Sequence, residues 1–294
     1  MKAFKIGFII LLLLLITACG QDDSSDNSET QEQETFKIGA IPDQDAAELS
    51  RSMDGIADYI AEETGLKVEY VPSVDYSALV TAFDRGEIQL AWFGGLTGVQ
   101  ARNLVPEAEA IAQRPRDEEF TSVFIAQSDA GIESLEDLEG ASFTFGSESS
   151  TSGHLMPRHF LMEAGITPEE DFDGVPNYSG SHDKTYKLVE SGAFTAGVLS
   201  EAVWESAVSD EKVDPSKVKA FYTTPEYYDY NWTINTVDDT FGDGTKDKVK
   251  EAILNMGSGQ ADYLDLFQTD SFIETQNDNY KDIEEVAKQL GIIK

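Results

Sequence analysis

The sequence is poor in cysteine and in basic residues. Its 294 residues include one cysteine, Cys19, so no disulfide can form within the chain. Lysine and arginine together number 21 against 55 aspartate and glutamate, which gives a formal net charge of −34. Phosphate backbones and anionic lipid headgroups repel such a surface. We therefore expect neither nucleic acid nor an anionic membrane surface as a partner.

Long apolar runs are absent beyond the N-terminus. Lys2 and Lys5 precede an apolar run from Ile6 to Ile16, which is too short for a stable membrane span and is typical of a signal-peptide core. No later segment is apolar enough to cross a bilayer, so the rest is predicted to be soluble. With 40% hydrophobic residues, the chain can bury a core in one large domain or in two of ordinary size.

Cys19 lies in the sequence LITACG, directly after the apolar run. The small residues Thr17 and Ala18 precede it, and the motif is similar to a bacterial lipobox. This similarity implies that residues 1–18 are a removed signal peptide and that Cys19 becomes an acylated N-terminus. The alternative is a lone buried or free thiol. Residues 19–35 follow as a predicted flexible tether, because Gly20 to Glu34 carries six acids, no base and no large apolar residue.

From Phe36 onward, apolar strand-like runs alternate with helical patterns, which predicts an α/β fold with parallel strands. The first strand should end at Pro42 and the first helix at Thr64, before Gly65. That helix places Leu49, Met53, Ile56, Ala57 and Ile60 on one face. Further helices are predicted at SLEDLEG, 134–140, and over most of the tail from Thr245.

The order of these elements predicts two lobes, with the chain crossing between them more than once. We assign residues 36–121 to the start of the first lobe and residues 122–231 to the second. Residues 232–294 should return to the first lobe and end in C-terminal helices.

Hydroxyl side chains are concentrated in FGSESSTSGHLMPRHF, from Phe145 to Phe160. Ser150, Thr151 and Ser152 stand directly before Gly153, where a strand should give way to a helix. Free backbone N–H groups and the helix dipole at such a start favour an anion, and hydroxyls add neutral donors. The alternatives are a simple serine N-cap or a nucleophile with His154 as its base. The chain has no G-x-S-x-G elbow, and no carboxylate is spaced to orient the histidine.

A second turn of this kind occurs in AWFGGLTGVQARN. A buried strand and a glycine pair precede a helix predicted to begin at about Leu96 or Thr97, which again presents backbone N–H groups. Two such turns on facing lobes would close around one small anion.

Five motifs together resemble a known family: DYSALVTAF, AWFGGLTG, ESSTSG, SGSHD and TPEYYDYNW. They are similar to the PhnD-like phosphonate- and phosphite-binding proteins of ABC importers, which have the type II periplasmic-binding-protein fold. The resemblance covers nearly all of residues 36–294. Within the family, FGSESSTSGHLMP and WFGGLTGVQAR are most similar to a subgroup described as selenate-binding proteins.

The resemblance implies an oxyanion held in a cleft at the hinge between two lobes. The positions that match the family's site are Tyr76, Phe93, Ser150, Thr151, Ser152, His182 and Asp229. Phe93 stands where some members have tyrosine, so one phenol donor is missing. Alternatively, Tyr76 and Phe93 are core aromatics, His182 is a solvated loop residue and Asp229 bonds within its own loop.

Asp229 bears on the class of ligand. A carboxylate accepts hydrogen bonds, so it favours a phosphonate, phosphite or phosphate that carries an O–H and repels fully ionised selenate or sulfate. The subgroup resemblance favours selenate instead, and both readings stay open here.

These patterns predict an extracytoplasmic solute-binding lipoprotein of an ABC importer, with no catalytic centre, cofactor or metal. We expect a monomer anchored through Cys19 to the outer face of the cytoplasmic membrane, which passes its oxyanion to a permease and its ATPase. The alternatives are a sensor that hands the same ligand to a signalling receptor and a hydrolase that uses the SSTSGH hydroxyls.

Overall fold

A computed structural model describes residues 33–294 of the chain. The predicted signal peptide, the lipidation site Cys19 and most of the predicted tether lie outside these residues. Glu34–Lys294 forms one compact unit. No helix within the described part is long and apolar enough to span a membrane.

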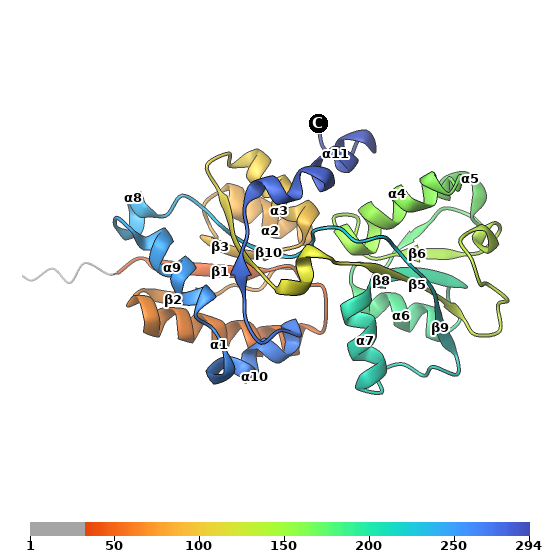
Figure 1. The fold of residues 1–294 in the computed structure, drawn as a ribbon, viewed down its shortest axis with the longest axis horizontal. Helices are drawn as coiled ribbons and strands as arrows, with labels where there is room; N and C mark the ends of the chain where they lie inside the picture. The colour runs from red at the N-terminus through yellow and green to blue at the C-terminus, as the bar shows by residue number, and fades with distance from the viewer. Residues whose placement is uncertain (1–32) are drawn as a thin grey trace, which may run out of the picture. The chain divides into compact units, whose positions relative to one another are not determined.

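The first sheet has six strands in the order β11-β4-β10-β3-β1-β2. Their bounds are β1 Thr35–Ala40, β2 Lys67–Tyr70, β3 Leu90–Phe93, β4 Glu109–Gln113, β10 Asn231–Ile234 and β11 Ile273–Glu274. β1 pairs in parallel with β2 and β3, whereas β10 runs antiparallel between β3 and β4. The sheet is therefore assembled from both ends of the described chain (Figure 1).

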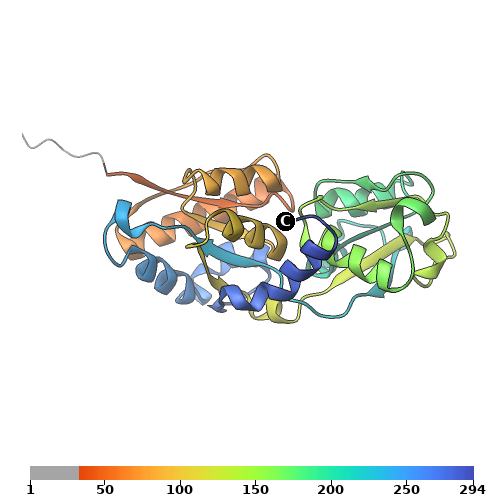
Figure 2. The ribbon, with the colours of Figure 1, turned by 90° about the horizontal axis from the view of Figure 1, so that it is seen from above.

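The helices that pack on the first sheet lie on both of its faces (Figure 1). Their bounds are α1 Ala46–Thr64, α2 Tyr76–Asp84, α3 Gly95–Leu104, α8 Asp238–Phe241, α9 Thr245–Leu254, α10 Ala261–Leu264 and α11 Lys281–Gln289. α1 packs with α9 and α10, while α2 and α3 pack together and α11 contacts α3 and α4. In Figure 2, α11 lies beside α3 and extends towards the part of the chain that contains α4.

The second sheet has five strands in the order β7-β6-β8-β5-β9. Their bounds are β5 Ser122–Gln127, β6 Phe143–Phe145, β7 Asn177–Tyr178, β8 Ala196–Ser200 and β9 Val218–Thr223. The helices beside it are α4 Met156–Glu163, α5 Pro168–Asp171, α6 His182–Glu190 and α7 Glu201–Ser209. β6 pairs in parallel with β7 and β8, and β5 runs antiparallel to β8 and β9.

The first helix shows how closely local sequence specifies an element. Asp45 caps α1 by accepting hydrogen bonds from the N–H groups of Ala47 and Glu48 at 3.0 and 3.1 Å. Gly65 ends it in the left-handed conformation, with φ of 72°. The buried face includes all five residues predicted from the apolar spacing.

Three local predictions are wrong. Each sheet is mixed rather than parallel, because the chain returns to the first sheet through β10 and enters the second through β5 in the opposite direction. SLEDLEG forms only one 3-10 turn, Glu136–Leu138, instead of a helix. β1 begins at Thr35, so the last residue of the predicted tether belongs to a strand.

Two crossover segments connect the sheets, one between β4 and β5 and one between β9 and β10. They run side by side, because Phe120 and Tyr227 exchange backbone hydrogen bonds of 2.9 Å in both directions. The N–H of Asp229 also donates to the carbonyl of Asp117 at 3.1 Å. Asp229 is thus fixed at the junction of the two sheets.

Candidate functional site

The hydroxyl segment forms a tight turn that leads from β6 into α4. Thr151–Leu155 is a π-helical turn, in which the Leu155 N–H donates to the carbonyl of Ser150 at 3.0 Å. Ser150 is its N-cap, since its Oγ accepts the N–H of Gly153 at 2.9 Å. Ser150, Thr151 and Ser152 are all at most 3% exposed. The simple cap is therefore present, and it occupies one hydroxyl of the three.

Gly153 permits this turn to close. A Cβ atom at position 153 would lie 3.1 Å from the Cα of Gly146 and 3.2 Å from Cε1 of His182. Larger side chains would push the turn away from both β6 and α6.

The second predicted turn connects β3 to α3. Gly94 is the N-cap residue and the helix begins at Gly95, slightly earlier than expected. A Cβ on Gly94 would lie 3.2 Å from Thr151 Oγ1 and 3.3 Å from Asp229 Oδ1. The glycine pair therefore allows the backbone to approach both side chains.

The two turns meet in the structure. The N–H of Leu96 donates to Thr151 Oγ1 at 3.0 Å, and the N–H of Gly95 donates to Asp229 Oδ1 at 2.9 Å. The positive end of α3 thus faces both the hydroxyl turn and a carboxylate. Because Thr151 Oγ1 accepts from Leu96, its own O–H proton remains a donor.

Asp229 is buried at 1% exposure, and its Oδ2 has no hydrogen-bond partner in the described protein. Burial raises the pKa of Asp229 to about 7, against the lowering effect of the Gly95 N–H and of the Thr151 and Ser152 hydroxyls. The group therefore exchanges a proton near neutral pH, so it can accept from or donate to an oxyanion.

We expect the Asp229→Asn variant to gain stability over wild type as the pH rises. The folded-state pKa of about 7 lies above the unfolded value of about 4, so the folded protein holds a proton that the unfolded chain releases between these values. That stabilisation is complete below the unfolded pKa and is lost as the pH rises through the folded one. The amide does not titrate, so the difference should grow by about 3 kcal/mol between about pH 4.5 and about pH 8.

Urea unfolding at the two pH values measures this difference. Asp43 also titrates, but it does so in both proteins and its contribution cancels to first order. A difference that stays constant with pH, or that grows in favour of wild type, would contradict the raised pKa.

Tyr76 is the first residue of α2 and is 2% exposed. Its hydroxyl has no hydrogen-bond partner in the described protein. Burial, with the nearby carboxylates of Asp43 and Asp229, holds the pKa of Tyr76 well above its ordinary value. Tyr76 is therefore a buried neutral phenol with a proton to donate.

Phe93 lies at the end of β3 and is fully buried. It packs edge-to-face on Phe83, with ring centroids 5.5 Å apart. The structure thus gives Phe93 the contacts of a core aromatic.

His182 begins α6 and is fully buried rather than solvated. Its Nδ1 accepts the N–H of Ser200 at 3.3 Å, so Nε2 carries the proton and faces Tyr230 Oη at 3.3 Å. Tyr230 Oη in turn donates to Asp43 Oδ2 at 2.8 Å. Burial lowers the pKa of His182 to about 4, so the imidazole is neutral at physiological pH.

Asp43 and Tyr230 were not predicted as site residues. Tyr230 follows Asp229 inside the motif TPEYYDYNW, and Asp43 comes directly after the predicted end of the first strand. Each position could therefore have been singled out from its neighbours in the sequence. A backbone hydrogen bond also joins His182 to Asp43, since the His182 N–H donates to the carbonyl of Asp43 at 3.0 Å. Burial raises the pKa of Asp43 to about 6.

His154 has contacts that exclude it as a base for the hydroxyls. Its Nδ1 lies 2.7 Å from the carbonyl of Glu148, and its Nε2 accepts from Arg158 Nε at 2.9 Å. Burial lowers the pKa of His154 to about 4. The residue packs between Phe145 and Tyr178 as a structural side chain.

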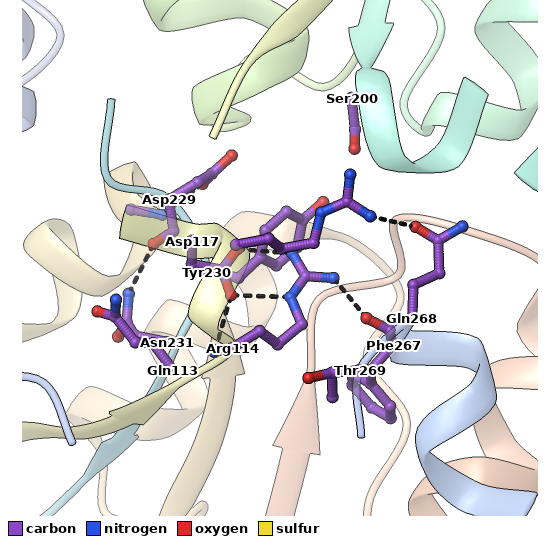
Figure 3. A network of polar contacts seen from close by, with 12 residues as sticks. Gln113, Arg114, Asp117, Ser200, Asp229, Tyr230, Asn231, Phe267, Gln268 and Thr269 are labelled. Carbon is purple, nitrogen blue, oxygen red and sulfur yellow. Dashed lines mark hydrogen bonds and ion pairs between the residues drawn. The ribbon is translucent and has the colours of Figure 1, made fainter. Parts of the chain in front are cut away.

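A buried ion pair supports the crossover beneath the site. Arg114 Nε and Nη2 bond the two carboxylate oxygens of Asp117 at 2.8 and 2.6 Å, and Nη1 donates to the carbonyl of Phe267 at 2.9 Å (Figure 3). The guanidinium lies 4.6 Å from the ring centroid of Tyr230. Tyr230 and Asp229 are therefore both fixed by this pair, one through its ring and one through its backbone.

The described residues offer no cluster of three or more His, Cys, Asp or Glu that could hold a metal ion. The chemistry assembled here is hydrogen bonding, from hydroxyls, a phenol, a neutral imidazole and helix N–H groups. A sequence profile of the family described as "ABC transporter, phosphonate, periplasmic substrate-binding protein" matches residues 38–280.

The chain belongs to this family.

Two curated members of the phosphonate-binding family align over much of the chain. The probable ABC transporter phosphite binding protein PhnD1 of Prochlorococcus marinus (strain MIT 9301) is 39% identical over 269 residues, which are 88% of this chain and 91% of the relative. The phosphate-import protein PhnD of Mycolicibacterium smegmatis (strain ATCC 700084 / mc(2)155) is 27% identical over 221 residues, which are 71% and 69% of the two chains.

A solved structure of the Prochlorococcus marinus (MIT 9301) protein, at 1.52 Å resolution in complex with methylphosphonate, superimposes with a TM-score of 0.85. The match covers 88% of this chain and 99% of that one, at 39% identity. The fold is thus the type II periplasmic-binding fold, as the sequence motifs predicted. Members of the family are substrate-binding proteins of ABC transporters and act outside the cytoplasm.

Proposed function

We propose that this protein binds a small tetrahedral phosphorus oxyanion, either phosphite, a phosphonate or phosphate, and delivers it to an importer. The observation that carries the proposal is the meeting of the hydroxyl turn with the start of α3 around Asp229. Hydroxyls and helix N–H groups donate to oxyanion oxygens, and a carboxylate with a pKa of about 7 accepts from a ligand O–H. The names of the relatives support this class of ligand.

We assign the ligand contacts to Tyr76, Ser150, Thr151, Ser152, His182 and Asp229, with Phe93 as a packing neighbour at the end of β3. The first and second sheets would be the cores of two lobes, and the site lies where side chains from both meet. Closure of the lobes would bury the ligand and present one shape to a permease. The protein itself would do no chemistry.

The net charge of −34 does not oppose this proposal. Charges on the surface are screened beyond about 8 Å at physiological salt, whereas the site's donors would touch the ligand directly. Contact geometry therefore outweighs net charge.

We further propose that the protein is a monomeric lipoprotein, acylated at Cys19 after removal of residues 1–18. Residues 19–34 would tether the binding unit to the outer face of the cytoplasmic membrane. Its partners would be a permease and the associated ATPase. Metabolic labelling with a palmitate analogue, with Cys19→Ser as the control, should give a labelled band for wild type alone.

We expect methylphosphonate, phosphite or phosphate to raise the melting temperature of the unit Glu34–Lys294. A ligand that binds only the folded state stabilises it by about 2.7 kcal/mol at a hundred times Kd. Selenate and sulfate serve as fully ionised tetrahedral controls at pH 8, where Asp229 is mostly ionised and neither anion has an O–H to donate to it. A rise in melting temperature with selenate alone would identify selenate as the ligand. If none of the anions raises the melting temperature, the proposal is wrong.

A further inference from the structure

A set of polar contacts outside the proposed ligand site joins α7, which packs beside the second sheet, to segments that pack with the first sheet. These segments, with the first sheet and its helices, are called the first part below. Arg116, in the crossover turn Pro115–Glu118, donates through Nη2 to Glu205 Oε2 at 3.0 Å. Gln268, in the returning C-terminal part, donates through Nε2 to Ser206 Oγ. Adjacent residues of α7 are thus held by two different segments of the first part.

The two segments are also bonded to each other. Arg116 Nη1 donates to Gln268 Oε1 at 2.8 Å, and the neighbouring Phe267 carbonyl accepts from Arg114 at 2.9 Å. Figure 3 shows Phe267 and Gln268 beside Arg114, on the opposite side of it from Asp229. Gln268 has φ of 50°, a left-handed conformation that is uncommon outside glycine and that the two bonds of its side chain help to hold.

A further ion pair joins the region of α7 to the first part. Lys212, just after α7, lies 3.2 Å from Glu48 of α1. All of these side chains except Arg114 and Phe267 line one cavity of about 760 Å³, whose walls come from α1, α7 and the segment 262–268. The cavity contains no residue of the hydroxyl turn and no Asp229. Gln268 also lines a smaller pocket with Asp43 and Tyr230, so one end of this set of contacts lies near the proposed oxyanion site.

We propose that Arg116, Gln268, Glu205 and Ser206 form a latch that stabilises the closed arrangement of the two sheets and thereby sets ligand affinity without touching the ligand. The proposal rests on the proposed function, in which closure buries the oxyanion. A contact made only in the closed form contributes to binding through the closing equilibrium, whereas a contact within one part contributes only to folding. Glu48 and Lys212 would support the latch across the cavity.

The test is the double variant Glu205→Gln/Ser206→Ala, which removes the latch from α7 and leaves the proposed ligand contacts in place. Partly exposed ion pairs and hydrogen bonds are individually weak, so we expect Kd for methylphosphonate and phosphite to rise about three- to tenfold, by the same factor for both. The increase should reside in the dissociation rate, because the closed form opens sooner.

Glu109→Gln is the matched control. Glu109 pairs with Lys246 at 2.6 Å within the first part, and the exposures of 49% and 35% are close to the 57% and 32% of Glu205 and Arg116. This variant should leave Kd and the dissociation rate unchanged. A double variant that dissociates no faster than Glu109→Gln would overturn the latch.

Small-angle scattering of the unliganded proteins separates the latch from the proposed function. If wild type binds none of the oxyanions, the proposed function fails, but the latch still predicts a larger radius of gyration for the double variant than for wild type. Equal radii together with equal dissociation rates would show that these contacts do not govern closure.

Discussion

Replacement of Thr151 by valine should weaken binding of methylphosphonate or phosphite about ten- to a hundredfold. Valine keeps the branched shape of threonine but has no hydroxyl, so the ligand loses one donor and the Leu96 N–H loses its acceptor at 3.0 Å. A hydrogen bond to a charged group is worth about 1.5 to 3 kcal/mol, which corresponds to this loss of affinity. Titration calorimetry measures it directly.

Two other threonine variants test whether the loss of affinity comes from the Thr151 hydroxyl itself. Thr151→Ser retains the hydroxyl and should bind within a few-fold of wild type. Thr144→Val removes another buried hydroxyl, which bonds Asn177 Nδ2 at 2.9 Å in the second sheet, and should cost stability without changing Kd. If Thr151→Val binds as wild type does, Thr151 has no role in the oxyanion site. Ser150→Ala and Ser152→Ala should each weaken binding to a comparable extent.

Replacement of Asp117 by alanine should lower the free energy of unfolding by about 3 to 5 kcal/mol. Asp117 is fully buried and bonds Arg114 through both oxygens, and the side chain of Arg114 is 6% exposed. Removal of the carboxylate leaves an uncompensated buried charge, which is the costly way to break an ion pair. Urea denaturation of the wild type and variant gives the difference.

The pair Asp278–Lys281 is the matched control for this loss. It has the same spacing of three residues along the chain and an N···O distance of 3.1 Å, but its side chains are 71% and 62% exposed. Asp278→Ala should therefore cost less than about 1 kcal/mol. Asp117→Asn keeps an acceptor for the guanidinium and should fall between the two variants. A loss of less than about 1 kcal/mol for Asp117→Ala would show that water reaches Arg114.

The elements with strong local signals were predictable from the sequence. α1 has an acidic N-cap, an apolar stripe and a glycine stop, and each device acts within a few residues. β4 had no comparable signal, since Glu109–Gln113 is rich in alanine and is a strand only because β10 and β11 pair with it. SLEDLEG has a local helical pattern but forms only a 3-10 turn, because a pattern of seven residues is too short to form a helix alone.

The candidate site likewise has features that were predictable from the sequence and features that were not. The hydroxyl turn and the glycine turn were visible as strand-to-helix junctions, because free N–H groups at a helix start follow from local geometry. The acceptor role of the Thr151 hydroxyl, the burial of His182 and the Tyr230–Asp43 bond depend on residues far apart in the chain. A pattern along the sequence holds no information on such distances.

The sequence by itself determined the α/β class, the two anion-favouring turns and, through five motifs, membership of the phosphonate-binding family. These features depend on composition and on spacing of a few residues. Only the tertiary structure decided that Gly95 and Leu96 face Asp229 and Thr151, and that burial raises the pKa of Asp229 to about 7. Those properties arise from desolvation and from contacts between residues 55 or more positions apart, which exist only once the chain has folded.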